Sequence, residues 1–249
     1  MDNNRKWWET DSCMLHVLAM ALMLCDHMWH TLFPSQEWLT CIGRIAYPIF
    51  AFMIVEGYFH TRNFKKYVTR MLVFALISEI PFNLMYNGTI IFPYHQNVMW
   101  TFFIALLGMK LMDTVKAKEK LVLTIFADFI IVFVCAILAL IGFTDYFSTG
   151  VLMVFVFYFF HGRKWWCYLG QFIGMYYLNV EVLGGYYYNI ELFGMHFELI
   201  QQSLALLSLI PIWLYRGKQG YHSKPFQYFN YAFYPLHMLV LVAIGYLVS

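Results

Sequence analysis

Five ionisable residues that could carry out chemistry lie within apolar stretches of the first third of the chain: Asp26, His27, His30, Arg44 and Glu79. Histidine titrates near neutral pH and can accept a proton, and a neighbouring carboxylate fixes its tautomer and raises its basicity. The sequence therefore predicts general-base catalysis by a histidine of this group, with a nearby carboxylate that orients it. Arg44 would either pair with Glu79 or stabilise an oxyanion, two tasks for which arginine is suited.

The same residues allow other interpretations. Buried polar side chains in a membrane protein can simply hydrogen-bond one helix to another. Ionisable groups inside a membrane can also form a proton relay, as in a proton-coupled transporter. The spacing of His27 and His30 with Asp26 would suit zinc, but it is unspecific, and we predict no metal site. The sequence contains no G-x-S-x-G, P-loop, Rossmann or H-E-x-x-H motif.

Helices in a lipid membrane must position these side chains. The chain has 249 residues, of which 61% are hydrophobic and only 12% are charged, about half of the charged fraction usual in soluble domains. Apolar runs of roughly 15–20 residues recur to the end of the chain, as expected for membrane-spanning helices. We predict a single all-α domain over residues 1–249. It would have nine spans, at residues 14–33, 39–59, 67–86, 98–112, 121–142, 149–161, 165–183, 197–215 and 226–248.

Positive charges indicate how the nine predicted helices are oriented. All Lys and Arg residues except Arg44 fall on the side of the N-terminus, beginning with Arg5 and Lys6. By the positive-inside rule that side is cytoplasmic, and the C-terminus lies outside. The outer connections contain no Lys or Arg, and they are residues 34–38, 87–97, 143–148 and 184–196. We expect the second and fourth of them to form a lid over the outer face. Asp145, in the third, is either a turn or cap residue or a functional one.

Two basic segments lie on the predicted cytoplasmic side, residues 60–70 and 215–224, and both combine cations with aromatic rings. Such segments can contact lipid headgroups. They could also bind a phosphorylated cytosolic cofactor, because Lys and Arg hold phosphates and aromatic rings stack on a base. The candidate cofactor-binding residues in these segments are His60, Arg62, Asn63, Lys65, Arg70, Tyr215, Arg216 and Lys218.

Several stretches of the sequence, taken together and in order, resemble the TraX family of conjugal-transfer pilin acetylases. They are DHMWHTLF, IGRIAYPIFAFMIVEGYFHTRNFKKYVTRMLVFALISEIPFNL, TDYFSTGVL, YRGKQG and YFNYAFYPLHMLVL, and they cover most of the chain. The residues that match the family's motifs are Asp26, His27, Gly43, Arg44, Pro48, Glu56, Gly57, His60, Thr61, Ser78, Glu79, Pro81, Phe82, Asn83, Tyr234, Pro235 and His237.

The resemblance implies a multi-pass acyltransferase in the bacterial cytoplasmic membrane. It would move an acetyl group from cytosolic acetyl-CoA to an amine or hydroxyl acceptor, such as the N-terminus of a pilin subunit, a small amine or another envelope molecule. His27, oriented by Asp26 or Glu79, would act as general base or as acetyl carrier. His237 would join the cofactor-binding residues. Membrane lipid is an expected partner and nucleic acid is not. The segment from Gly170 to Gly174 allows close helix packing within one chain or between copies.

Two rival functions follow from the same residues. A proton-coupled transporter would also need intramembrane Asp, His, Glu and Arg side chains. The sequence lacks the internal repeats of many transporters, which counts against this class. In an assembly partner within an envelope complex, the polar side chains would only hold helices together. Acetyl-CoA binding would distinguish the acyltransferase from both.

Overall fold

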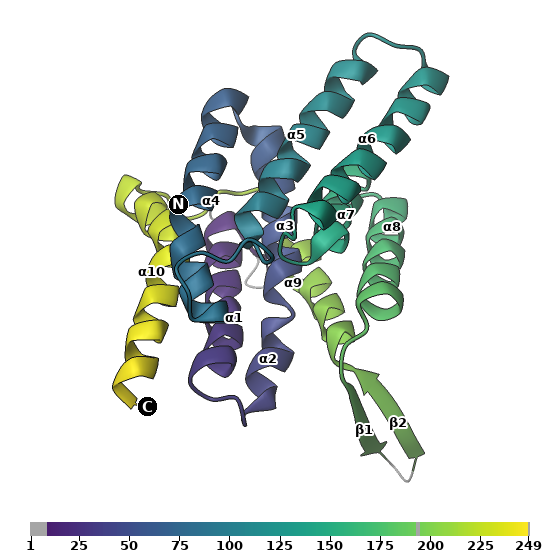
Figure 1. Cartoon of the computed structure of the whole chain (residues 1–249). Coiled ribbons are helices and arrows are strands. Elements are labelled where there is room, and N and C mark those ends of the chain that lie inside the picture. Colours follow the sequence, from purple (N-terminus) through teal and green to yellow (C-terminus); the bar gives the residue numbers. More distant parts are fainter. Residues whose placement is uncertain (1–8, 193–194, 249) are drawn as a thin grey trace. The chain divides into compact units, whose positions relative to one another are not determined.

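The computed structural model describes residues 9–192 and 195–248, and these residues are predominantly α-helical (Figure 1). Arg5 and Lys6, the first cations of the predicted cytoplasmic side, lie outside the described residues. The helices are α1 (Ser12–Thr31), α2 (Glu37–Gly43), α3 (Ala46–His60), α4 (Phe64–Asn87), α5 (Val98–Lys116), α6 (Leu121–Ile141), α7 (Phe147–Phe159), α8 (Trp165–Tyr176), α9 (Leu209–Leu214) and α10 (Lys224–Val248). A π-helix η1 (Tyr177–Leu183) and a 3₁₀ helix η2 (Gln201–Ser208) flank a hairpin of β1 (Tyr187–Leu192) and β2 (Met195–Ile200).

The predicted class, a helical membrane protein, is confirmed. Within the described residues, six segments are long and apolar enough to cross a membrane: α1, Glu37–His60, α4, α5, α6 and α10. The segments Phe147–Phe159 and Gln201–Leu214 are shorter apolar helices. Helix α6 has the highest mean hydropathy, 2.9, yet only 17% of its apolar window is buried. An exposed helix of this composition is stable only against lipid. The count of nine spans and the sides of the termini stay predictions.

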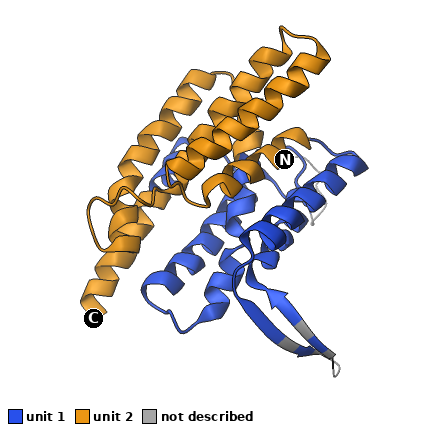
Figure 2. Ribbon diagram, turned by 45° about the vertical axis from the view of Figure 1, so that its right-hand side comes forward, with its two compact units in different colours: residues 1–53, 162–233 blue, residues 54–161, 234–249 orange. Residues whose placement is uncertain are grey.

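The chain divides into two compact units (Figure 2). Unit 1 comprises residues 1–53 and 162–233, and unit 2 comprises residues 54–161 and 234–249. In unit 1, α1 packs along α2, α2 contacts η2, and α8 continues into η1. In unit 2, α4, α5, α6 and α7 pack in sequence order, and α5 also contacts α7. Large apolar side chains such as Phe102, Met109 and Phe155 are almost fully buried there.

The second predicted span, residues 39–59, lies within one candidate membrane segment, Glu37–His60, which consists of two helices. Helix α2 ends at Gly43, and α3 begins at Ala46, so Arg44 and Ile45 form a break. Pro48 explains where the new helix starts. Proline has no N–H and fits best in the first turn of a helix, where no intrahelical partner is needed, and Pro48 is the third residue of α3.

The structure also corrects the region after α8. The predicted loop 184–196 and the first residues of the predicted span 197–215 form the antiparallel hairpin, with Tyr187 opposite Ile200 and Leu192 opposite Met195. Gly184 and Gly185 have φ of 63° and 101°, a conformation that ends η1 and that glycine adopts without strain. The aromatic and β-branched residues that follow favour a strand.

Candidate functional site

A charged cluster joins α1 to the end of α2 in unit 1. A side-chain nitrogen of Arg44, Nη2, donates to the carboxylate oxygen Oδ1 of Asp26 in a close ion pair. The hydroxyl of Thr40 donates to the same oxygen at 2.7 Å. Arg44 also bonds to Thr40 through Nη2, at 3.0 Å from the hydroxyl oxygen, and through Nε, at 3.3 Å from the carbonyl oxygen. We call these three residues the Asp26–Thr40–Arg44 cluster.

Gly43 allows this close approach. A Cβ atom at this position would lie 2.7 Å from Oδ1 and 2.9 Å from Cγ of Asp26, well inside the contact distance. The family motif Gly-Arg therefore has a physical explanation in this chain. Gly43 lets α2 pack closely against α1, and Arg44 can then form its ion pair with Asp26.

His27 follows Asp26 on α1 and is buried, with 7% of its surface exposed. The hydroxyl of Thr31 donates to its carbonyl oxygen at 2.7 Å, which tightens this last turn of α1. His30, one turn further along, is exposed, and its ring lies 6.4 Å from that of Trp29. The two histidines thus differ in environment, and the burial singles out His27.

The described hydrogen bonds of the Asp26 carboxylate are with Arg44 and Thr40, and orientation of the His27 ring by Asp26 stays a prediction. Adjacent residues on a helix point in different directions, so Asp26 and His27 cannot face the same partner directly. Asp26 therefore fixes Arg44 and the α1–α2 contact beside the histidine. Among the described residues, no group of three or more His, Cys, Asp or Glu side chains is placed to hold a metal ion.

Glu79 belongs to unit 2, on α4, and has its own set of partners there. Its Oε2 atom accepts hydrogen bonds from Asn97 Nδ2 and, at 3.1 Å, from Trp100 Nε1. Its Oε1 atom is buried without a hydrogen-bond partner among the residues that the structure describes. The ion pair that the structure gives for Arg44 is with Asp26, so pairing of Arg44 with Glu79 stays a prediction.

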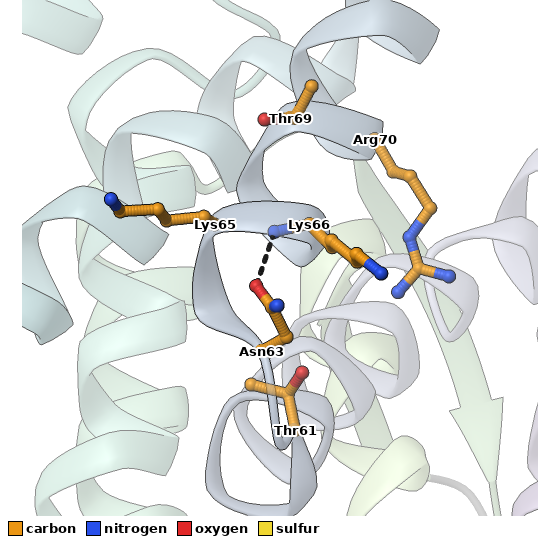
Figure 3. A pocket seen from close by; sticks show the side chains of 6 residues that line it. All are labelled: Thr61, Asn63, Lys65, Lys66, Thr69 and Arg70. Atoms are coloured by element: carbon orange, nitrogen blue, oxygen red, sulfur yellow. Dashed lines mark hydrogen bonds between the residues drawn. The ribbon is translucent and has the colours of Figure 1, made fainter.

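The first basic segment forms an open pocket at the start of α4 (Figure 3). The side chain of Asn63 caps α4 by accepting a hydrogen bond from the Lys66 amide at 3.0 Å. The pocket has a volume of ≈ 480 Å³, within the range of small-molecule sites. Figure 3 shows the charged ends of Lys66 and Arg70 on one side of the helix and that of Lys65 on the other. Its lining residues are Thr61, Asn63, Lys65, Lys66, Thr69 and Arg70.

This pocket contains three of the predicted cofactor-binding residues of its segment, and it adds Lys66. The signal that could have identified Lys66 is its four-residue spacing from Arg70, which places both on one helix face. His60 lies at the end of α3, is largely exposed, and donates from Nδ1 to the carbonyl oxygen of Glu56 at 2.8 Å. Arg62 lies in the connection between α3 and α4.

The second basic segment belongs to unit 1 and is held to the start of α1. The Arg216 side chain lies 3.5 Å from a carboxylate oxygen of Glu9. The backbone carbonyl of Lys218 accepts a hydrogen bond from the Ser12 amide at 2.9 Å. The ring of Tyr215 packs edge-on against Phe52, with centroids 5.5 Å apart. This segment therefore has a structural task in unit 1, beside any role in binding.

His237 lies in α10, within unit 2, and is buried, with its ring 6.0 Å from that of Tyr234. Sequence reasoning overlooked another histidine, His161, whose Nε2 atom lies 2.7 Å from the carboxylate of Glu56. It also overlooked Asp113, whose two oxygens each accept a hydrogen bond at 2.6 Å, one from Tyr58 and the other from Tyr158. These partners are far apart in the sequence, so no local spacing could have revealed them.

Comparisons with known proteins agree with the motif pattern. The family described as TraX protein matches residues 12–245. The probable fimbrial assembly protein FimC, serogroup H1, of Dichelobacter nodosus is 32% identical in an alignment 106 residues long that covers 38% of this chain and 43% of that protein. The match thus spans less than half of the length of this relative. No solved structure matches the chain significantly. Because the family match extends over nearly the whole chain, this membrane protein belongs to the TraX family.

Proposed function

We propose that this protein is an integral membrane acetyltransferase that uses acetyl-CoA as donor and an amine or hydroxyl as acceptor. The observation that carries the proposal is the buried His27 beside the Asp26–Thr40–Arg44 cluster. An imidazole in a site that excludes water is suited to nucleophilic or general-base work. The guanidinium of Arg44, which Asp26 holds in place, can stabilise negative charge that develops on a carbonyl oxygen.

His27 could act in this reaction either as a general base or as a carrier of the acetyl group. As a general base it would take the proton of the acceptor while the acceptor attacks the thioester carbon and the CoA thiolate leaves. As a carrier, its ring nitrogen would attack the thioester carbon and hold the acetyl group until the acceptor displaces it. In either case Asp26 holds Arg44 in place, because one carboxylate oxygen of Asp26 accepts hydrogen bonds from both Arg44 and Thr40.

The phosphates of acetyl-CoA are proposed to bind in the pocket at the start of α4. Lys65, Lys66 and Arg70 supply three positive charges there, and Asn63 and Thr61 supply polar groups. Lysine and arginine form strong charge-assisted hydrogen bonds with phosphate. The roles of His60, Arg62, Tyr215, Arg216, Lys218 and His237 as further cofactor ligands remain proposals of the same kind.

A pilin subunit is the proposed acceptor, with its N-terminal amine as the acetylated group, and a small amine is the alternative. The support comes from the family and from the relative, which is described as a probable fimbrial assembly protein. Since the match covers only part of that relative, the acceptor stands as a proposal for this chain. The bacterial cytoplasmic membrane is the proposed location, because acetyl-CoA is a cytosolic donor.

The test is acetyl-CoA binding and slow thioester hydrolysis by detergent-purified protein. We would compare the wild type with His27→Ala and with His16→Ala, which removes another histidine of α1 whose ring bonds to the backbone of Ser12. The expected result is saturable binding by all three proteins and loss of hydrolysis in His27→Ala alone. Equal hydrolysis by wild type and His27→Ala would remove His27 from the reaction. No binding at millimolar acetyl-CoA by well-folded protein would refute the acyltransferase, and substrate uptake into vesicles would then be measured.

A further inference from the structure

A histidine and an aspartate from two connecting segments meet at one end of the unit 2 helices. Nε2 of His95 lies 3.8 Å from Oδ1 of Asp145. Backbone hydrogen bonds join the two segments: the Gln96 amide donates to Phe143 O at 2.8 Å, and the Asp145 amide donates to Gln96 O at 2.9 Å. The hydroxyl of Thr101 on α5 donates to the Asp145 carbonyl at 2.8 Å. Hydrogen bonds between the two segments therefore hold these side chains close together.

The segment that carries Asp145 has a strained backbone. Phe143, Tyr146 and Phe147 have φ of 50°, 61° and 47°, and within residues 9–192 and 195–248 they are the only residues other than glycine with positive φ. Bulky residues rarely adopt this conformation, and such strain gathers at functional sites. The Asp145 carboxylate accepts from the Tyr146 amide at 3.1 Å. A helix cap would instead bond to the second or third amide of α7. Capping therefore does not account for Asp145.

The imidazole of His95 is held in place but remains accessible. Its ring packs edge-on against Phe82, with centroids 4.8 Å apart, and against Tyr86 at 5.5 Å. The side chains of His95 and Asp145 are 30% and 29% exposed. A ring fixed by aromatic neighbours and open at one edge can meet a second molecule without a large conformational change.

Two further polar side chains of unit 2 interact with this pair. Glu79 interacts electrostatically with His95, and the buried Tyr234 interacts electrostatically with both Asp145 and Glu79. The Oε1 atom of Glu79 is the buried oxygen that lacks a hydrogen-bond partner among the described residues.

We propose that His95 takes the proton of the acceptor during acyl transfer and that Asp145 is its positioning residue. This inference rests on the acyltransferase function proposed above. Since Nε2 faces Asp145, Nδ1 is the atom that accepts the proton. The acceptor's lone pair forms the bond to the acetyl carbon, its proton moves to Nδ1, and the leaving group departs with its electron pair. His95 then releases the proton to the thiolate or to water.

The test uses full-length protein in detergent and measures CoA release from acetyl-CoA with two probe acceptors, ethanolamine and hydroxylamine. The amine of ethanolamine is protonated at neutral pH and needs a base, whereas hydroxylamine is largely unprotonated and needs none. We expect His95→Gln to lower kcat with ethanolamine by about a hundredfold or more, the usual contribution of a general base. Turnover with hydroxylamine and the KM for acetyl-CoA should stay near those of the wild type.

Three further proteins complete the experiment. Asp145→Asn should show the same selective loss in smaller degree, and Asp145→Glu should restore part of the activity with ethanolamine. His196→Gln, an exposed histidine of the hairpin, serves as the control. An equal loss with both acceptors would mean that His95 is only structural, and unchanged turnover with both would remove it from the reaction. A wild type that releases no CoA with either acceptor would refute the proposed function itself, and this inference with it.

Discussion

Replacing Gly43 by alanine would place a methyl group inside the Asp26–Thr40–Arg44 cluster. The new carbon would lie 2.7 Å from Oδ1 and 2.9 Å from Cγ of Asp26, whereas unstrained carbon contacts are about 3.5–4.0 Å. Helices α1 and α2 must therefore separate by about 1 Å, since the backbone of α2 carries the methyl group.

The expected effect of Gly43→Ala on stability is small. Overpacking costs about 1–3 kcal/mol, and the higher helix propensity of alanine offsets about 1 kcal/mol of it. The effect on activity should be larger, because a displacement of about 1 Å next to a reacting group can lower the rate about a hundredfold. We therefore expect a melting temperature lowered by a few degrees at most, about 2–4 °C per kcal/mol of net cost, and a severe loss of acetyl transfer.

Gly108→Ala provides a matched control. A Cβ atom at Gly108 would lie 2.8 Å from Phe155 and 2.9 Å from Cys135, a similar conflict in an apolar part of unit 2. Both variants would be purified in the same detergent, and CoA release and thermal unfolding would be measured side by side. Gly108→Ala should keep its turnover at a similar melting temperature. Wild-type turnover in Gly43→Ala, with α1 and α2 intact, would refute the reasoning that the placement of Asp26 and Arg44 matters for catalysis.

Two further predictions concern hydrogen bonds inside unit 2. Asp113→Ala removes the hydrogen-bond acceptor of both Tyr58 and Tyr158, so the free energy of unfolding should fall by about 2–4 kcal/mol. Asp113→Asn should lower it less. A melting curve of Asp113→Ala that does not shift would contradict this prediction. Asn97→Asp keeps the cap of α5 but loses the donors to Glu79 and sets two carboxylates together, so it should destabilise by about 2 kcal/mol or more. If Asn97 acted only as a cap, this variant would unfold at the wild-type temperature.

Much of the helical architecture is readable from the sequence. Predicted spans 67–86 and 121–142, for example, agree closely with α4 and α6. The reason is that a chain in lipid must pair its backbone groups internally, so each long apolar run becomes a helix. The hairpin escaped prediction because its strands are short and aromatic, a composition that also suits a membrane interface. The break at Arg44 escaped it because the apolar run continues through it.

The sequence by itself determined the class of the protein, its family and the identity of the intramembrane ionisable residues, since composition and motif order depend on local sequence alone. The tertiary structure decided which of these residues are partners. In the structure Arg44 pairs with Asp26, and His95 lies beside Asp145. Pairings of this kind depend on which helices and connections lie side by side, and packing of the whole chain fixes that arrangement.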